Sequence, residues 1–278
     1  MAHNISPDAE AILDQEFKVL DNGFIRLVDY LGSDSRIVQA ARVSYGDGTK
    51  TVREDRGLIN YLIKNAHWSP FEQVILTFHI KLPIFVARQW IRHRTARVNE
   101  ISARYSVMKD EFYVPSSNQL KYQSKNNKQG RSDEELSEED KSKILQSIID
   151  SQTSAFDHYK EMIDLGLSRE LSRIVLPVNL YTEWYWQVDL RNLFNFLKLR
   201  MDFHAQFEIR SYANVMADIT KKVAPISYEA FEEHVLYAQS FSRSEISSIL
   251  SLINNKTCLL QGKDQKELFR KLGLNDES

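Results

Sequence analysis

At 278 residues with 42% hydrophobic side chains, the chain can bury the core of one large domain or of two small ones. Its formal net charge of −2 excludes the basic excess that a general nucleic-acid or membrane surface needs. Its single cysteine, Cys258, excludes an intramolecular disulfide and a cysteine-type metal site, and it favours a reducing compartment.

The chain begins with a polar stretch, residues 1–18, which predicts a loose arm. This stretch has no basic region followed by an apolar core, so it does not resemble a secretion signal. No window of the chain reaches the roughly 18 apolar residues of a membrane-spanning helix. We therefore expect a cytoplasmic protein without a membrane partner.

The pattern then predicts alternating strands and helices. A turn signal at Asn22-Gly23 precedes a strand over 24–31, whose apolar residues alternate. Further elements follow in order: a helix from Ser33 or Asp34 to about residue 44, a helix over 55–66, a central strand over 72–82 and a short helix over 83–92.

The second half begins with a surface insertion, residues 116–140, which is rich in Ser, Asn, Lys and acidic residues and lacks an apolar period. Helices are predicted over 137–165, 169–174, 190–200, 205–223 and 225–235, and an aromatic-rich strand is predicted over 179–188. We interpret Trp184, Tyr185 and Trp186 of that strand as core residues. The fold class is α+β: one domain with a core over about 20–235 and a helical appendage over 240–278.

A dense polar cluster follows the helix over 83–92. It holds several arginines with Asn, Glu and Ser side chains between residues 88 and 106. Arginine forks match phosphate oxygens, so the cluster indicates a small phosphorylated ligand, whereas an exposed basic loop is the alternative. The seven histidines show no paired metal-site spacing, the nine glycines form no phosphate loop, and no nucleophile elbow is present. We expect no metal.

The order of residues in this cluster adds a resemblance. Arg92-His93-Arg94, then seven residues, then Ser102 is similar to the signature of the flavin-dependent thymidylate synthases. The stretches NEISARYS (99–106), AARVS (40–44), HWSPFE (67–72), 173–200 and DFHAQFEIRSYA (202–213) also resemble that family, so about residues 23–233 are covered. The resemblance implies a mixed, bent sheet flanked by helices, and a homotetramer whose active sites draw on several subunits.

The resemblance implies reductive methylation of dUMP to dTMP. Methylenetetrahydrofolate would donate the carbon, and FAD reduced by NADPH would donate the hydride. The expected partners are therefore dUMP, folate and NADPH, and no nucleic acid. A non-catalytic nucleotide-binding or RNA-binding module with an arginine-rich phosphate loop is the alternative of a different class.

The same resemblance assigns the site residues. Catalytic roles fall to Arg200, His67 and Ser102. Residues implied to bind dUMP are Gln89, Arg92, Glu100, Ile101, Ser102, Ala103, Arg104, Arg173 and Arg200. Residues implied to bind FAD are Ser44, Ser69, Glu72, Arg92, His93, Arg94, Glu100, Asp189, Arg191, Asn195 and His204.

Two of these positions depart from the family pattern, because Asp189 stands where relatives often have Asn and Ala103 where some have Gly. Asp accepts but does not donate a hydrogen bond, so the FAD contact of Asp189 is open. His204 is four residues after Arg200, and it would share a helical face with Arg200 if that helix continued.

Overall fold

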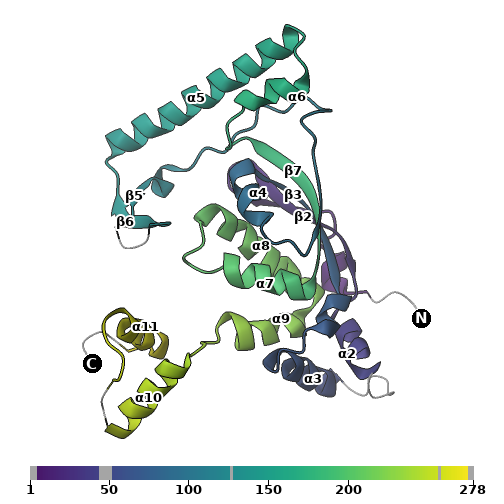
Figure 1. Cartoon of the computed structure of the whole chain (residues 1–278). Coiled ribbons are helices and arrows are strands. Elements are labelled where there is room, and N and C mark those ends of the chain that lie inside the picture. The colour runs from purple at the N-terminus through teal and green to yellow at the C-terminus, as the bar shows by residue number, and fades with distance from the viewer. Residues whose placement is uncertain (1–4, 44–51, 126–127, 256–257, 275–278) are drawn as a thin grey trace. The chain divides into compact units, whose positions relative to one another are not determined.

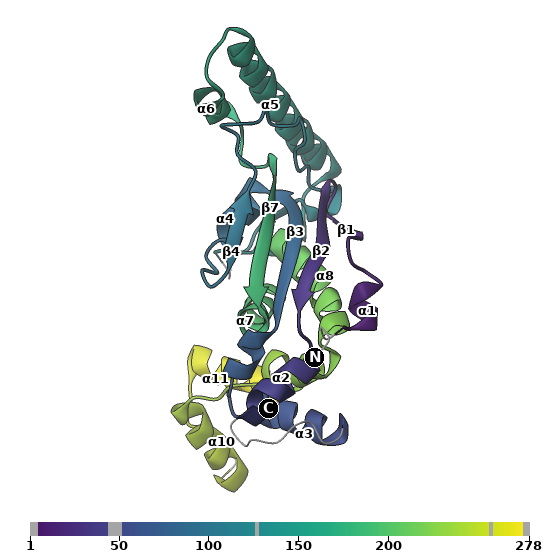
Figure 2. The ribbon, with the colours of Figure 1, turned by 90° about the vertical axis from the view of Figure 1, so that its right-hand side faces the viewer.

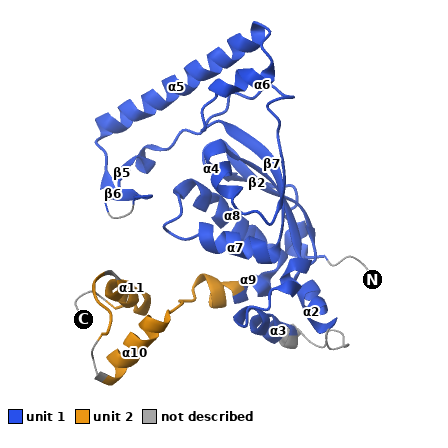
Figure 3. Ribbon diagram, in the orientation of Figure 1, with its two compact units in different colours: residues 1–230 blue, residues 231–278 orange. Residues whose placement is uncertain are grey.

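The computed structural model describes residues 5–43, 52–125, 128–255 and 258–274. It divides into two compact units, Met1–Ala230 and Phe231–Ser278 (Figure 3). Every residue that the sequence predicts for the site belongs to the first unit. None of the described helices is long and apolar enough to cross a membrane.

The first unit is built on an antiparallel sheet with the strand order β1-β2-β3-β7-β4 (Figure 2). The strands are β1 (Glu16–Val19), β2 (Gly23–Leu31), β3 (Ile75–Pro83), β7 (Tyr181–Asp189) and β4 (Arg97–Glu100). The α+β class is confirmed, although every described pairing in this sheet is antiparallel where the resemblance implied a mixed sheet. The central position predicted for β3 is also confirmed, because β3 pairs with both β2 and β7.

Helices pack on one face of the sheet (Figure 1). They are α4 (Ile84–Trp90), α7 (Leu190–Arg200) and α8 (Phe207–Val223). Trp90 is fully buried between them, with its ring centroid 4.5 Å from that of Phe196 and 6.0 Å from that of Tyr212. Burying an aromatic side chain contributes about 1.5–3 kcal/mol, so this cluster fixes the position of the short helix α4.

Gly23 allows the sheet and α8 to approach closely. The Tyr212 hydroxyl donates a hydrogen bond to the backbone carbonyl of Lys81, 2.7 Å away. A Cβ on Gly23 would lie 2.1 Å from that hydroxyl oxygen and 2.9 Å from the Lys81 carbonyl oxygen. Glycine is therefore required here because only the absence of a side chain leaves room for the hydroxyl.

The remaining helices of this unit are α1 (Pro7–Glu10), α2 (Asp34–Arg42), α3 (Val52–Lys64), α5 (Glu138–Asp164), α6 (Arg169–Ser172) and most of α9 (Pro225–Phe231), with 3₁₀ turns η2 (Ser69–Gln73), η3 (Ser117–Gln119) and η4 (Arg173–Val175). Most of these helices lie beyond the ends of the sheet, with α5 and α6 past one end and α2 and α3 past the other (Figures 1 and 2). The long helix α5 starts as predicted, since the Ser137 hydroxyl accepts a hydrogen bond from the Asp140 amide at 3.1 Å.

Three sequence-based expectations need correction. Residues 1–18 are not wholly a loose arm, because α1 forms within them and the edge strand β1 begins at Glu16. The central strand begins at Ile75 rather than Glu72, since Pro70 favours the 3₁₀ turn η2. The surface insertion contains a small antiparallel hairpin, β5 (Lys121–Gln123) and β6 (Arg131–Glu135), which its sequence pattern did not predict.

The second unit contains the π-helical turn η5 (Glu232–Leu236) and two α-helices, α10 (Arg243–Asn255) and α11 (Gly262–Leu272). Lys271 of α11 reaches Glu245 of α10 at 2.6 Å, which joins the two helices. The buried Ser248 hydroxyl accepts hydrogen bonds from the Leu259 and Leu260 amides and lies 3.1 Å from the Cys258 Sγ. These described contacts join α10, α11 and the segment between them within the second unit.

Candidate active site

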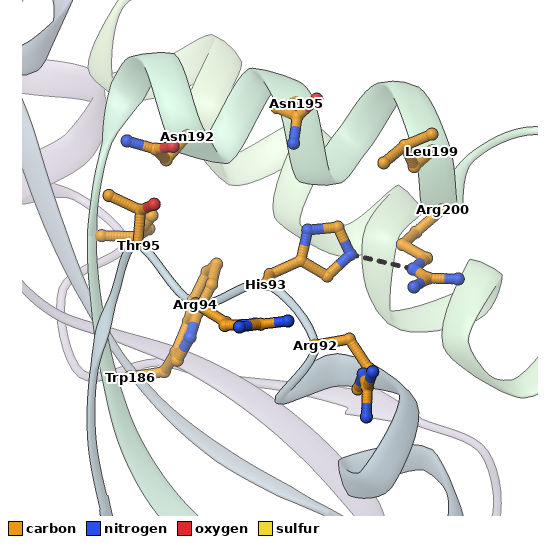
Figure 4. A pocket seen from close by; sticks show the side chains of 10 residues that line it. Arg92, His93, Arg94, Thr95, Trp186, Asn192, Asn195, Leu199 and Arg200 are labelled. Carbon is orange, nitrogen blue, oxygen red and sulfur yellow. Dashed lines mark hydrogen bonds between the residues drawn. The ribbon is translucent and has the colours of Figure 1, made fainter.

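A cavity of about 260 Å³ lies between the segment after α4 and helix α7 (Figure 4). The first wall is the turn Arg92-His93-Arg94-Thr95, which follows the buried Trp90 and the C-cap Ile91 at the end of α4. The second wall is one face of α7. Asn192, Asn195, Leu199 and Arg200 of α7 line this wall, and Trp186 and Val188 of β7 complete the lining. The cavity lining contains guanidinium and amide groups but no carboxylate, so its electrostatics favour an anionic ligand.

A hydrogen bond joins the two walls. The Arg200 Nε donates to the His93 Nε2 at 3.0 Å, and the His93 ring lies edge-on to the buried Phe196 ring. Burial and the neighbouring Arg200 charge lower the pKa of His93 to about 4. Burial also lowers the pKa of Arg200. His93 is therefore a neutral acceptor at pH 7, and it holds the guanidinium against the cavity.

The start of α7 is fixed by Asp189. Its carboxylate accepts hydrogen bonds from the Asn192 amide at 3.0 Å and from the Asn192 side chain at 2.7 Å. Two residues after Asp189, Arg191 pairs with Glu72 of η2. Asp189 thus caps the start of α7, and Arg191 attaches the helix to η2. Together they orient the helical face that bears Asn195 and Arg200.

A second cavity, of about 460 Å³, adjoins η2 and α2. Ser69, predicted for FAD, lines it together with Arg36, Gln39 and Gln73. The Arg36 guanidinium is oriented by the side-chain oxygens of Gln39 at 3.0 Å and Gln73 at 3.4 Å. Arg36 was not predicted from the sequence, because no signature surrounds it. Its position on the solvent face of the predicted helix, close to AARVS, was the only available signal.

The end of β4 and the segment after it hold another group of predicted residues. The Glu100 carboxylate accepts a hydrogen bond from the Thr182 hydroxyl at 2.6 Å. Ile101 continues the edge pairing, since its amide donates to the Glu183 carbonyl at 2.9 Å. The Ser102 hydroxyl accepts from the Arg104 amide at 3.3 Å, and Ala103 lies between these two residues.

Glu170 of α6 contacts two arginines that are predicted to bind dUMP. It pairs with Arg104 at 3.0 Å, and its backbone carbonyl accepts from the Arg173 Nε at 3.2 Å. None of Ser102, Arg104 and Arg173 lines the cavity beside Arg200. Within one copy, the predicted dUMP residues therefore form two groups. Glu170 was missed because a lone acid on a four-residue helix gives no sequence signal.

The structure contradicts two further expectations. Helix α7 ends at Arg200, so His204 does not share its helical face and lies instead in the following loop, 2.8 Å from Asp202. Tyr185 is 43% exposed and stacks on His79 with ring centroids 4.9 Å apart, so the core interpretation fails for it. It holds for Trp184 and Trp186, each 1% exposed.

The other predicted residues have these positions. His67 is exposed just after α3, with its ring edge-on to Tyr61. Gln89 lies on α4 and donates a hydrogen bond to Gln206. Ser44 lies outside the described residues. Across 5–43, 52–125, 128–255 and 258–274, no three His, Cys, Asp or Glu residues gather as metal ligands.

Comparisons with known proteins identify the family of the chain. The family model "Thymidylate synthase complementing protein" matches residues 26–226. The flavin-dependent thymidylate synthase of Treponema denticola is 56% identical over 260 residues, covering 94% of this chain and 98% of the relative. The Treponema pallidum protein of the same name is 50% identical, covering 98% of this chain and 89% of the relative.

A solved structure shares the fold. The UMP/dUMP methylase PolB from Streptomyces cacaoi, crystallised with 5-Br dUMP, aligns with a TM-score of 0.71 and 34% identity. The alignment covers 78% of this chain and 97% of PolB. Sequence, family model and fold therefore agree, and the chain belongs to the flavin-dependent thymidylate synthase family.

Proposed function

We propose that the protein converts dUMP to dTMP by reductive methylation. Methylenetetrahydrofolate supplies the carbon, and FAD, reduced by NADPH, supplies the hydride when bound. The observation that carries the proposal is the cavity in which the Arg92-His93-Arg94 turn faces Asn195 and Arg200. Its donor-rich lining fits a flavin and a nucleotide phosphate, which present acceptor oxygens and nitrogens. The comparisons give no support to a non-catalytic nucleotide-binding or RNA-binding module.

The uracil ring is assigned to Arg200. Its guanidinium would stabilise the negative charge that develops on the ring when the ring is activated, and the hydrogen bond to His93 keeps the guanidinium in place. No cysteine attack is needed in this proposal, and the described contacts of Cys258 are with Ser248 in the second unit. His67 and Ser102 are proposed as further catalytic residues.

The dUMP phosphate is assigned to Arg92, Ser102, Arg104 and Arg173. Arg104 and Glu170 are both more than half exposed, so their ion pair contributes less than about 1 kcal/mol. A phosphate can displace Glu170 at little cost and gain bidentate contacts with the arginine. Gln89, Glu100, Ile101, Ala103 and Arg200 complete the proposed dUMP contacts.

FAD is assigned to residues on both cavities. Ser69 and Glu72 lie on η2, His93 and Arg94 on the turn after α4, and Arg191 and Asn195 on α7. Arg92, Glu100 and Ser44 are further proposed contacts. His204 is proposed from the loop after α7. For Asp189, the capping contacts suggest a role through Asn192 and α7 rather than a direct hydrogen bond to the flavin.

A complete site is proposed to require several copies of the chain. Support comes from the two groups of phosphate-binding candidates, because Ser102, Arg104 and Arg173 do not line the cavity that contains Arg92 and Arg200. A homotetramer would bring the two groups together from different subunits. We propose a cytoplasmic location, since the substrates are intracellular metabolites and a single cysteine suits a reducing compartment.

Reconstitution tests the proposal. The purified protein, incubated with excess FAD and desalted, should retain a flavin absorption spectrum. It should then form dTMP from dUMP, methylenetetrahydrofolate and NADPH. A protein that retains no flavin after desalting, or a flavin-loaded protein that forms no dTMP, would contradict the proposed function. Size-exclusion chromatography with light scattering separately tests the tetramer.

A further inference from the structure

Gln206 contacts the proposed substrate residue Gln89. The Gln89 side chain donates from its Nε2 to the Gln206 Oε1, although the two residues are 117 positions apart. Both side chains are half-buried. Gln89 is on α4, one turn before the cavity-lining His93, and Gln206 directly precedes α8. The family resemblance assigns a role to Gln89 but none to Gln206.

Two sets of contacts fix the place where this bond forms. Trp90, next to Gln89, packs against Tyr212 of α8, with ring centroids 6.0 Å apart. The backbone carbonyl of Gln206 accepts from the Arg210 amide at 3.0 Å, which starts the helix. The distance between α4 and the start of α8 is therefore set by a buried aromatic contact and not by the two amides.

The first turn of α8 is also held from outside the helix. Glu208 is 1% exposed, and its Oε1 accepts from the Tyr113 hydroxyl at 3.0 Å and from Arg131 of the insertion hairpin at 2.5 Å. A buried carboxylate with two donors is costly to move, because separating them leaves its charge unpaired. Gln206 is thus attached to a fixed turn, two residues from Glu208.

We infer that Gln206 is a positioning residue that holds the Gln89 side chain in the orientation required for nucleotide binding. Its oxygen takes one hydrogen of the Gln89 amide nitrogen, which leaves the Gln89 oxygen as an acceptor for a donor group on the nucleotide. Without Gln206, the Gln89 side chain must lose its rotamer freedom when the nucleotide binds, and affinity falls. This inference rests on the proposed contact of Gln89 with dUMP.

The test compares FAD-loaded Gln206→Met, Gln206→Glu, Gln89→Met and the Gln89→Met/Gln206→Met double variant. Methionine removes the acceptor at similar size, whereas glutamate keeps an acceptor in the same place. Loss of a neutral hydrogen bond weakens binding by a factor of about 3 to 10. Gln206→Met should therefore raise the Kd and the KM for dUMP by that factor. We expect kcat, FAD content and Tm to stay close to those of the parent.

The two remaining variants separate positioning from a structural role. Gln206→Glu should restore the parent dUMP affinity. In the Gln89→Met background, Gln206→Met should add nothing, because the side chain that it positions is already gone. Ser211→Ala is the matched control on α8, since the Ser211 hydroxyl bonds within that helix to the Phe207 carbonyl at 2.9 Å.

Additive losses in the double variant, or a Gln206→Glu protein as weak as Gln206→Met, would overturn the inference. So would a Gln89→Met protein with unchanged dUMP affinity, although dTMP formation by the parent would then leave the proposed function standing. Failure of the proposed function itself is distinguishable, because the parent protein would then form no dTMP.

Discussion

The Arg200 Nε lies 3.0 Å from the His93 Nε2 and donates a hydrogen bond to it across the cavity. A guanidinium has no acceptor, so this bond exists only while the imidazole nitrogen carries no proton. The second ring nitrogen then bears the hydrogen. One histidine tautomer therefore determines where the charge of Arg200 is placed.

This relationship predicts how stability changes with acidity. The pKa of His93 is about 4 in the folded protein and about 6.5 in an unfolded chain. Between these values the unfolded state binds more protons, so the free energy of unfolding should fall as the pH drops below about 6.5. His93→Gln should reduce this slope, as measured by urea denaturation from pH 4.5 to 7.5.

An NMR titration checks the same pKa directly. The His93 imidazole resonance, assigned by its loss in His93→Gln, should stay at its neutral position from pH 7.5 down to about 5. A midpoint near 6.5 in the folded protein would contradict the assigned hydrogen bond and the burial of the ring.

Arg200→Ala should lower the turnover of dUMP by about 100-fold or more while FAD remains bound. The expected loss follows from removing the donor proposed to face the developing charge on the uracil ring. Steady-state dTMP formation and the flavin spectrum measure the two effects. Lys198→Ala is the control, because Lys198 is exposed in the same last turn of α7. Parent-like turnover of Arg200→Ala would refute the assignment.

Asp189→Asn should change stability by less than about 1 kcal/mol, whereas Asp189→Ala should cost about 1 kcal/mol. Asn can accept the same hydrogen bond from the Asn192 amide, but Ala cannot. Urea denaturation gives the free energy of unfolding for each variant. Equal losses for the two substitutions would show that the cap is not what Asp189 contributes.

Arg131→Met should destabilise the first unit by about 1–3 kcal/mol, because Glu208 is buried and loses its cationic partner. The burial of the Tyr113 hydroxyl and its contact with Glu208 already raise the pKa of that hydroxyl. Combining Arg131→Met with Glu208→Gln should recover part of the loss, since the unpaired charge is removed. Thermal unfolding of both variants, compared with Lys125→Met on the exposed hairpin, measures this.

Local pattern predicted the central elements well. The alternation around Phe78 and Ile80 placed β3, and the cap at Ser137 placed the start of α5. Both signals depend on neighbours in sequence, such as the two-residue repeat of a strand and the hydrogen bond of a helix cap. The turn after α4 was placed correctly for the same reason.

Long-range contacts account for what the sequence analysis missed. Strand β4 is exposed and polar along Arg97–Glu100, and it exists because β7 offers it a hydrogen-bonding edge. The hairpin of the insertion depends in the same way on Arg131 meeting Glu208, 77 residues away. Gln206 could not be predicted, because its contact with Gln89 depends on how α4 packs against α8.

Gly23 connects the packing of β2 against α8 with the position of the cavity-lining turn. Any side chain there displaces the Tyr212 hydroxyl, and Tyr212 packs against Trp90, the residue from which the Arg92-His93-Arg94 turn emerges. We therefore expect a change to alanine or serine at position 23 to shift Tyr212 and Trp90, and with them the arginine turn. Among active descendants of this chain, position 23 should accept no other amino acid, although it contacts none of the proposed ligands.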